Sequence, residues 1–212
     1  MEIAQVDALL LAGGRGSRMG GVDKGLQRLK GLTLAAHAIE RIKCQQGERL
    51  QDVMVNANRN LDAYRELGFE VWPDALADFP GPLAGFLAGL EHCQSPWLLT
   101  VPCDTPRFPL DLLERLAQAA EREDADLALP LGRDDDGRLR RQPVFCLLRR
   151  ELRSGLHDYL LRGGRKIDDW IASVRHVAVA FDAPGDDPLA FYNANTLAEL
   201  QALETGLQPS QD

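Results

Sequence analysis

The glycine-rich and basic stretch at residues 9–24 constrains the fold of this chain more than any other feature. It begins as an apolar run, residues 8–12, whose length is typical of a buried strand. A loop follows that contains five glycines and three basic residues, Arg15, Arg18 and Lys24. Glycine lets backbone N–H groups approach an anion closely. The stretch therefore predicts a polyphosphate cradle at the end of a strand.

The loop matches neither of two common phosphate-binding motifs. It does not end in Gly-Lys-Ser/Thr, so it is not a Walker A loop. Met19 stands where the third glycine of the dinucleotide fingerprint would follow Gly14 and Gly16. The alternative is a flexible basic loop. We favour a phosphate site, because open α/β sheets bind ligands at the ends of their strands.

Apolar runs and helical periodicity alternate along the chain. Strands are predicted at 52–56, 69–72, 97–101, 127–129, 144–148 and 177–181. Helices are predicted at 34–44, 58–67, 82–92, 109–123, 150–161, 166–174 and 197–203. This order predicts an α/β fold: a single-domain, mostly parallel sheet flanked by helices, Rossmann-like, over residues 1–204. Residues 133–141 are interpreted as an exposed loop, and 205–212 as a polar tail.

Charge and cysteine usage exclude several classes of protein. A net charge of −8 argues against binding along a nucleic acid. The apolar runs fall short of the roughly 20 residues that a membrane span needs, and the first residues lack the basic segment of a signal peptide. The four cysteines are widely spaced, without a CxxC pair, which argues against structural zinc and is typical of a reducing cytoplasm.

Polar residues follow three of the predicted strands. Asn56 ends one strand, and an amide there offers a donor and an acceptor for a base; the alternative is a turn cap. Asp74 follows the next strand and offers a hydrogen-bond acceptor for a base or ribose; the alternative is a surface turn. Asp104 is the candidate Mg²⁺ ligand, because magnesium prefers carboxylate and phosphate oxygens; the alternative is a helix cap. Cys103 has no histidine near it in sequence and is interpreted as a small filler.

Two further groups are candidates for a second anionic substrate. Asn193 and Asn195 are two residues apart in an extended stretch, so their side chains are expected on one side, just before a predicted helix. The alternative is helix capping. Arg165 lies in a basic, glycine-containing turn, for which a solvated helix terminus is the alternative.

Five stretches resemble, in order and spacing, the molybdenum cofactor guanylyltransferases of the nucleotidyltransferase superfamily. They are LAGGRGSRMGGVDKGL at 11–26, VNANR at 55–59, DFPGPLAG at 78–85, PCDTP at 102–106 and NANT at 193–196. The resemblance extends from residue 11 to about residue 203. It implies an enzyme that transfers GMP from GTP to the terminal phosphate of molybdopterin, releases pyrophosphate and forms the guanine dinucleotide cofactor.

The resemblance also implies roles for individual residues. The nucleotide site would comprise Leu11, Ala12, Gly13, Gly14, Lys24, Asn56, Asp74 and Asp104; the catalytic groups Arg18, Lys24 and Asp104; the Mg²⁺ ligand Asp104; and the molybdopterin side Arg165, Asn193 and Asn195. Family members work beside cofactor-insertion and cofactor-delivery proteins, which implies transient protein contacts.

Three rival functions stay open on the sequence. A molybdopterin cytidylyltransferase typically reads L-A-A-G where this chain reads LAGG at 11–14. A sugar-phosphate or polyol nucleotidyltransferase shares the fold, but the DFPGPLAG and NANT stretches argue against it. A non-catalytic nucleotide-binding regulator would be expected to lack the equivalent of Lys24 or Asp104, and both are present.

Overall fold

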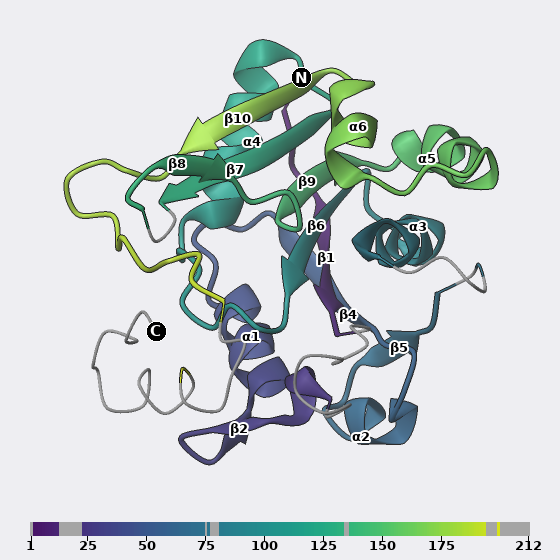
Figure 1. Ribbon diagram of the computed structural model, residues 1–212, viewed down its shortest axis with the longest axis vertical. Coiled ribbons are helices and arrows are strands. Elements are labelled where there is room, and N and C mark those ends of the chain that lie inside the picture. The colour runs from purple at the N-terminus through teal and green to yellow at the C-terminus, as the bar shows by residue number, and fades with distance from the viewer. Residues whose placement is uncertain are drawn as a thin grey trace.

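A mixed sheet of eight strands forms the centre of the protein in this computed structural model (Figure 1). The structure describes residues 2–12, 23–74, 76, 81–133, 136–193 and 199. The strands are β1 (Val6–Leu11), β4 (Leu50–Asn56), β5 (Glu70–Trp72), β6 (Trp97–Pro102), β7 (Leu127–Arg133), β8 (Leu139–Arg141), β9 (Cys146–Arg149) and β10 (His176–Ala180). Their order is β10-β7-β9-β6-β1-β4-β5, with β8 paired to β7.

The predicted mostly parallel sheet is confirmed, with one exception in its middle. The pairs β1–β4, β1–β6, β4–β5 and β7–β10 are parallel. Strand β9 is antiparallel to both of its neighbours, β6 and β7. The region 133–141, interpreted from sequence as a loop, instead contributes the short strand β8, which pairs antiparallel with the end of β7. That interpretation was wrong in part, because main-chain pairing with β7 extends a charged segment that has no apolar periodicity.

Helices cover both faces of the sheet. They are α1 (Leu34–Lys43), α2 (Leu61–Arg65), α3 (Pro82–His92), α4 (Leu112–Glu123), α5 (Leu152–Leu161) and α6 (Ile167–Ala172), with a one-turn 3₁₀ helix, η2 (Lys24–Leu26), and a small hairpin of β2 (Arg28–Leu29) and β3 (Leu32–Thr33). Ala8 and Leu10 of β1 pack with α1 and α4, while Leu9 between them packs with α3, α5 and α6. A strand buried on both faces explains the unbroken apolar run.

Several predicted helices are shorter in the structure, among them the one predicted at 150–161, which is Leu152–Leu161, and the one predicted at 166–174, which is Ile167–Ala172. The helix predicted at 58–67 is only Leu61–Arg65, because Asn60 before it takes a left-handed backbone conformation with φ of 50°. The helix predicted at 109–123 begins at Leu112. Apart from Glu199, the helix predicted at 197–203 lies outside the described residues, as does the tail.

The carboxyl ends of three strands lie together. Leu11 at the end of β1 is in register with Asn56 of β4 on one side and with Pro102 of β6 on the other. Beyond the strands, the Ala12 N–H donates to the Asn56 carbonyl at 2.8 Å, and the Cys103 N–H donates to the Leu11 carbonyl at 3.1 Å. The residues that follow these strands are therefore brought to one edge of the sheet.

The segment after β10 returns along the sheet toward the end of β6 (Figure 1). Two ion pairs hold it to the region of α4: Arg107 to Asp187 at 2.7 Å and Arg115 to Asp186 at 2.9 Å. The Phe191 ring packs so closely on Gly132 that a Cβ there would lie 2.4 Å from it. These contacts set the position of the residues that follow Phe191. Within the described ranges, no helix is both long and apolar enough to cross a membrane.

Candidate functional site

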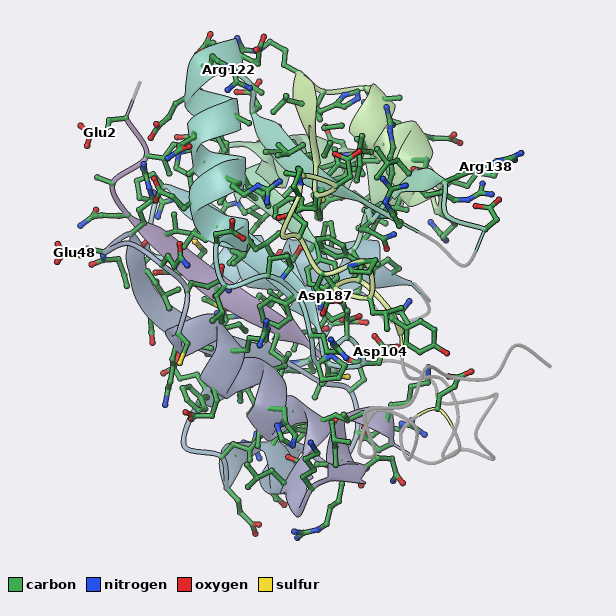
Figure 2. The ribbon with its side chains drawn as sticks, turned by 90° about the vertical axis from the view of Figure 1, so that its left-hand side faces the viewer. Glu2, Glu48, Asp104, Arg122, Arg138 and Asp187 are labelled. Atoms are coloured by element: carbon green, nitrogen blue, oxygen red, sulfur yellow. The ribbon has the colours of Figure 1, made fainter. Side chains whose placement is uncertain are left out.

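An ion pair between Lys24 and Asp104 lies at the carboxyl edge of the sheet. The Lys24 ammonium is 3.3 Å from Asp104 Oδ2, and the two side chains are 19% and 23% exposed. Lys24 begins η2, and Asp104 lies in the turn after β6, near the end of the central strands and below Asp187 in Figure 2. Two residues predicted for the same site, 80 positions apart in the chain, are thus brought into contact.

Asp104 is suited to a hard divalent cation. Its carboxylate is partly exposed at a strand end, where Mg²⁺ is typically bound by one or two carboxylates together with substrate phosphates. Among the described residues there is no cluster of three or more His, Cys, Asp or Glu side chains that could hold a metal by itself. Asp104 is therefore a residue that could hold a metal ion together with substrate phosphates.

Cys103, next to Asp104, is buried, and burial raises the pKa of its thiol far above the ordinary value. A protonated thiol is a poor nucleophile, so the interpretation of Cys103 as a filler agrees with its surroundings.

Asn56 and Asp74 form one hydrogen-bonded unit with Asn58. The Asn56 amide donates to Asp74 Oδ1 at 2.9 Å and to the Trp72 carbonyl at 3.1 Å. The Asn58 amide donates to Asp74 Oδ2 at 2.8 Å, and the Asp74 N–H donates back to Asn58 Oδ1 at 2.8 Å. Each carboxylate oxygen keeps capacity to accept a further hydrogen bond. Asp74 is thereby oriented as an acceptor next to the β4 end.

Helix α3 approaches this unit at Gly85. A Cβ on Gly85 would lie 2.5 Å from Asn56 Oδ1 and 2.7 Å from a methyl carbon of Leu11. Only glycine fits there without displacement. Asn56 itself is only 3% exposed, so its side chain is surrounded by protein atoms.

Asn193 reaches the turn that carries Asp104. Its Oδ1 accepts a hydrogen bond from the Thr105 hydroxyl at 2.5 Å, and the Thr105 side chain is fully buried. Thr105 was not singled out from the sequence, although its place in the PCDTP stretch was the available signal.

Arg165 lies elsewhere in the fold. It is exposed in the turn between α5 and α6, where its guanidinium donates to the carbonyls of Leu160 at 3.2 Å and Gly164 at 2.7 Å. In Figure 1 the α5–α6 segment lies beside the part of the sheet where β1 begins, rather than where β1 ends. The described contacts therefore do not bring Arg165 to Asp104. Four more predicted site residues, Gly13, Gly14, Arg18 and Asn195, lie outside the described residues.

Known proteins resemble this chain over nearly all of its length. A family model for the MobA-like NTP transferase domain matches residues 8–209. A molybdenum cofactor guanylyltransferase of Acidovorax ebreus is 62% identical, over 96% of this chain and 97% of that protein. One of Albidiferax ferrireducens is 59% identical, over 94% and 95%.

Solved structures share the fold at low sequence identity. Molybdopterin-guanine dinucleotide biosynthesis protein A of Archaeoglobus fulgidus superposes with a TM-score of 0.73 at 22% identity, covering 94% of this chain and 97% of that one. A nucleotidyl transferase of Methanothermobacter thermautotroptrophicus gives a TM-score of 0.68 at 20% identity, covering 95% and 97%.

Proposed function

This chain belongs to the MobA-like NTP transferase family, and from that premise we propose that it is a molybdenum cofactor guanylyltransferase. It transfers GMP from GTP to the terminal phosphate of molybdopterin and releases pyrophosphate. The observation that carries the proposal is the 62% identity to a protein of that name, over 96% of this chain. The Lys24–Asp104 ion pair and the hydrogen-bonded Asp74 support the proposal.

The choice of base rests on Asp74. Guanine presents two neighbouring N–H donors on its pairing edge, whereas cytosine presents one donor beside two acceptors. A carboxylate accepts two hydrogen bonds side by side, so the oriented Asp74 suits guanine. Asn56 and Asn58 hold the carboxylate in place, and each donates to a different oxygen. This geometry favours GTP over CTP.

The reaction is an in-line displacement at the α-phosphorus of GTP. A phosphate oxygen of molybdopterin forms the new P–O bond as the bond to the β-phosphate oxygen breaks, and pyrophosphate leaves with the electron pair. The work of the protein is positioning and charge stabilisation. Lys24 exchanges its contact with Asp104 for the nucleotide phosphates, and the glycine-rich stretch with Arg18 holds the leaving pyrophosphate.

Asp104 is the residue that would hold Mg²⁺. When bound there, the ion would supply positive charge that offsets the charge of the nucleotide phosphates. Release of Lys24 from Asp104 leaves the carboxylate open to a cation at the same time as the ammonium turns to the phosphates. One ion pair is thereby replaced by two favourable contacts.

The acceptor side comprises Asn193, Asn195 and Arg165. Asn193 is supported by its hydrogen bond to Thr105, directly beside Asp104. Arg165 is held at the α5–α6 turn and would contact only a distant part of the pterin substrate or of a protein that delivers it. Transient contacts with cofactor-insertion and cofactor-delivery proteins are part of the same proposal.

Pyrophosphate release tests the proposal. The purified protein is given Mg²⁺ and molybdopterin with either GTP or CTP. Release with GTP alone is the expected result. Release with CTP instead would make the protein a cytidylyltransferase and overturn the role of Asp74. Tight GTP binding without release would favour the non-catalytic regulator.

A further inference from the structure

Asp23, the residue before Lys24, has a buried carboxylate that accepts hydrogen bonds from three groups. It is 8% exposed. Its Oδ1 accepts hydrogen bonds from the Tyr64 hydroxyl at 2.6 Å and from the Gly25 N–H at 3.2 Å. Its Oδ2 accepts one from the Asn60 amide at 3.0 Å. Neither Tyr64 nor Asn60 was a candidate on the sequence, and we call Asp23, Asn60 and Tyr64 together the Asp23 brace.

The three donors to Asp23 are neutral groups. The carboxylate is therefore satisfied without drawing on the ammonium of its neighbour, and Lys24 extends to Asp104 instead. Asp23 also caps η2, whose first residue is Lys24, through the Gly25 N–H. The brace thus holds the main chain at the start of η2, from which the Lys24 side chain extends to Asp104.

Two backbone features accommodate the brace. A Cβ on Gly25 would lie 2.3 Å from the Tyr64 hydroxyl oxygen, so glycine leaves the room that this hydroxyl needs. Asn60 adopts a left-handed conformation at φ of 50° and precedes α2, but its side chain does not cap that helix. Asn60 thus donates to the carboxylate instead of capping its own helix.

The sequence before Lys24 is rich in glycine. Five glycines occur between residues 13 and 21, and glycine loses more conformational entropy on ordering than any other residue. Tyr64 is fully buried on α2, 41 residues from Asp23, so it joins the end of this stretch to the main fold. Burial and the bond to Asp23 raise the pKa of the Tyr64 hydroxyl, which therefore stays protonated as a donor.

We propose that Tyr64, acting through Asp23, is a positioning residue that holds the Lys24 ammonium within reach of Asp104 and of the nucleotide phosphates. This role rests on the proposed nucleotidyl transfer for its catalytic consequence. Its structural consequence, the placement of Lys24, is independent of that transfer.

The first test is Tyr64→Phe, which removes one hydroxyl and keeps the ring. We expect kcat/KM for GTP to fall about tenfold, since a hydrogen bond to a charged group is lost and Lys24 is no longer fixed. Tyr159→Phe is the matched control, because the Tyr159 hydroxyl donates only to the Lys166 carbonyl, at 3.0 Å, among the described hydrogen bonds. It should change kcat/KM by less than about twofold.

A double-mutant cycle separates positioning from general stability. In a Lys24→Ala background there is no ammonium to place, so Tyr64→Phe should then change kcat/KM by less than about twofold. The same tenfold loss in both backgrounds would overturn the proposal, and so would a Tyr64→Phe enzyme with wild-type kcat/KM. If Tyr64→Phe does not fold, Asn60→Gly takes its place, because glycine adopts the left-handed conformation and removes only the amide donor.

A second readout does not depend on GMP transfer. Amines are acetylated with a trace of acetic anhydride, and the rate at Lys24 is compared by mass spectrometry with that at the exposed Lys43. The ratio should rise about threefold or more in Tyr64→Phe as Lys24 leaves Asp104. A rise in a protein that transfers no GMP would keep the brace and refute the proposed function. An unchanged ratio in an active enzyme would refute the brace alone.

Discussion

Gly85→Ala should disturb the base site from the face of helix α3 that packs against Asn56. The added methyl group would lie 2.5 Å from Asn56 Oδ1 and 2.7 Å from Leu11 Cδ2, both closer than real Cβ contacts allow. Asn56 cannot turn aside freely, because its amide donates to the Trp72 carbonyl and to Asp74. Either α3 moves outward or these two hydrogen bonds are strained.

The structure sets the size of the effect. Overpacking a full core costs about 1–3 kcal/mol, and weakening one hydrogen bond costs about 1 kcal/mol. The higher helix propensity of alanine offsets about 0.5–1 kcal/mol of this loss in stability. The net loss for Gly85→Ala is about 2 kcal/mol, which corresponds to a Tm lower by about 4–8 °C for a chain of this length. If Asp74 turns with Asn56, GTP should bind about tenfold more weakly.

The assay pairs urea unfolding with GTP titration, and the chain supplies its own control. Gly155 lies in α5, and a Cβ there would meet nothing within 4 Å. Gly155→Ala should therefore stabilise the protein by about 0.5–1 kcal/mol and leave GTP affinity unchanged. If Gly85→Ala were as stable as Gly155→Ala and bound GTP with wild-type affinity, the close approach of α3 to Asn56 would affect neither stability nor GTP binding, and the prediction would be refuted.

Three further predictions follow from the ion pairs. Asp104→Ala should lower turnover at least about 100-fold, which pyrophosphate release measures. Because the ion pair with Lys24 is partly exposed, the same change should alter the free energy of unfolding by only about 0–1 kcal/mol, which thermal melting measures. Lys24→Ala should lower kcat/KM for GTP about 10- to 100-fold, and an unchanged value would remove its phosphate role. Hydrogen bonding to Arg115 holds the pKa of Asp186 below its ordinary value. The resulting stability is present above about pH 3.9 and is lost as the pH falls through the pKa of Asp186 in the folded protein. The free energies of unfolding of wild type and Asp186→Asn should therefore differ by about 1 kcal/mol at pH 7 and converge in acid.

The local elements were largely predictable because they depend on neighbouring residues. The run at 97–101 is apolar except for Thr100, which indicated a buried strand, and β6 is such a strand. Pro82 starts α3 as expected, since proline lacks only an N–H that the first helical turn does not use. Lys24 and Asp104 were assigned to one site from the sequence, and they form an ion pair in the structure.

Other features depend on partners that local patterns do not record. An apolar run is the same in either chain direction, so the antiparallel course of β9 between β6 and β7 was not predictable. Strand β8 exists only because β7 offers it a main-chain partner. Helix α2 begins later than predicted, because Asn60 before it has a left-handed backbone conformation and its amide donates a hydrogen bond to Asp23.

The sequence by itself determined most of the elements and which polar residues end the strands, because apolar periodicity, glycine and proline act over a few neighbouring positions. Only the tertiary structure decided how those residues are held. Thr105 meets Asn193 across 88 residues, and Tyr64 meets Asp23 across 41. Such contacts arise when buried polar groups must find partners in a packed interior. That requirement is satisfied by the fold as a whole, and no short stretch of the chain records it.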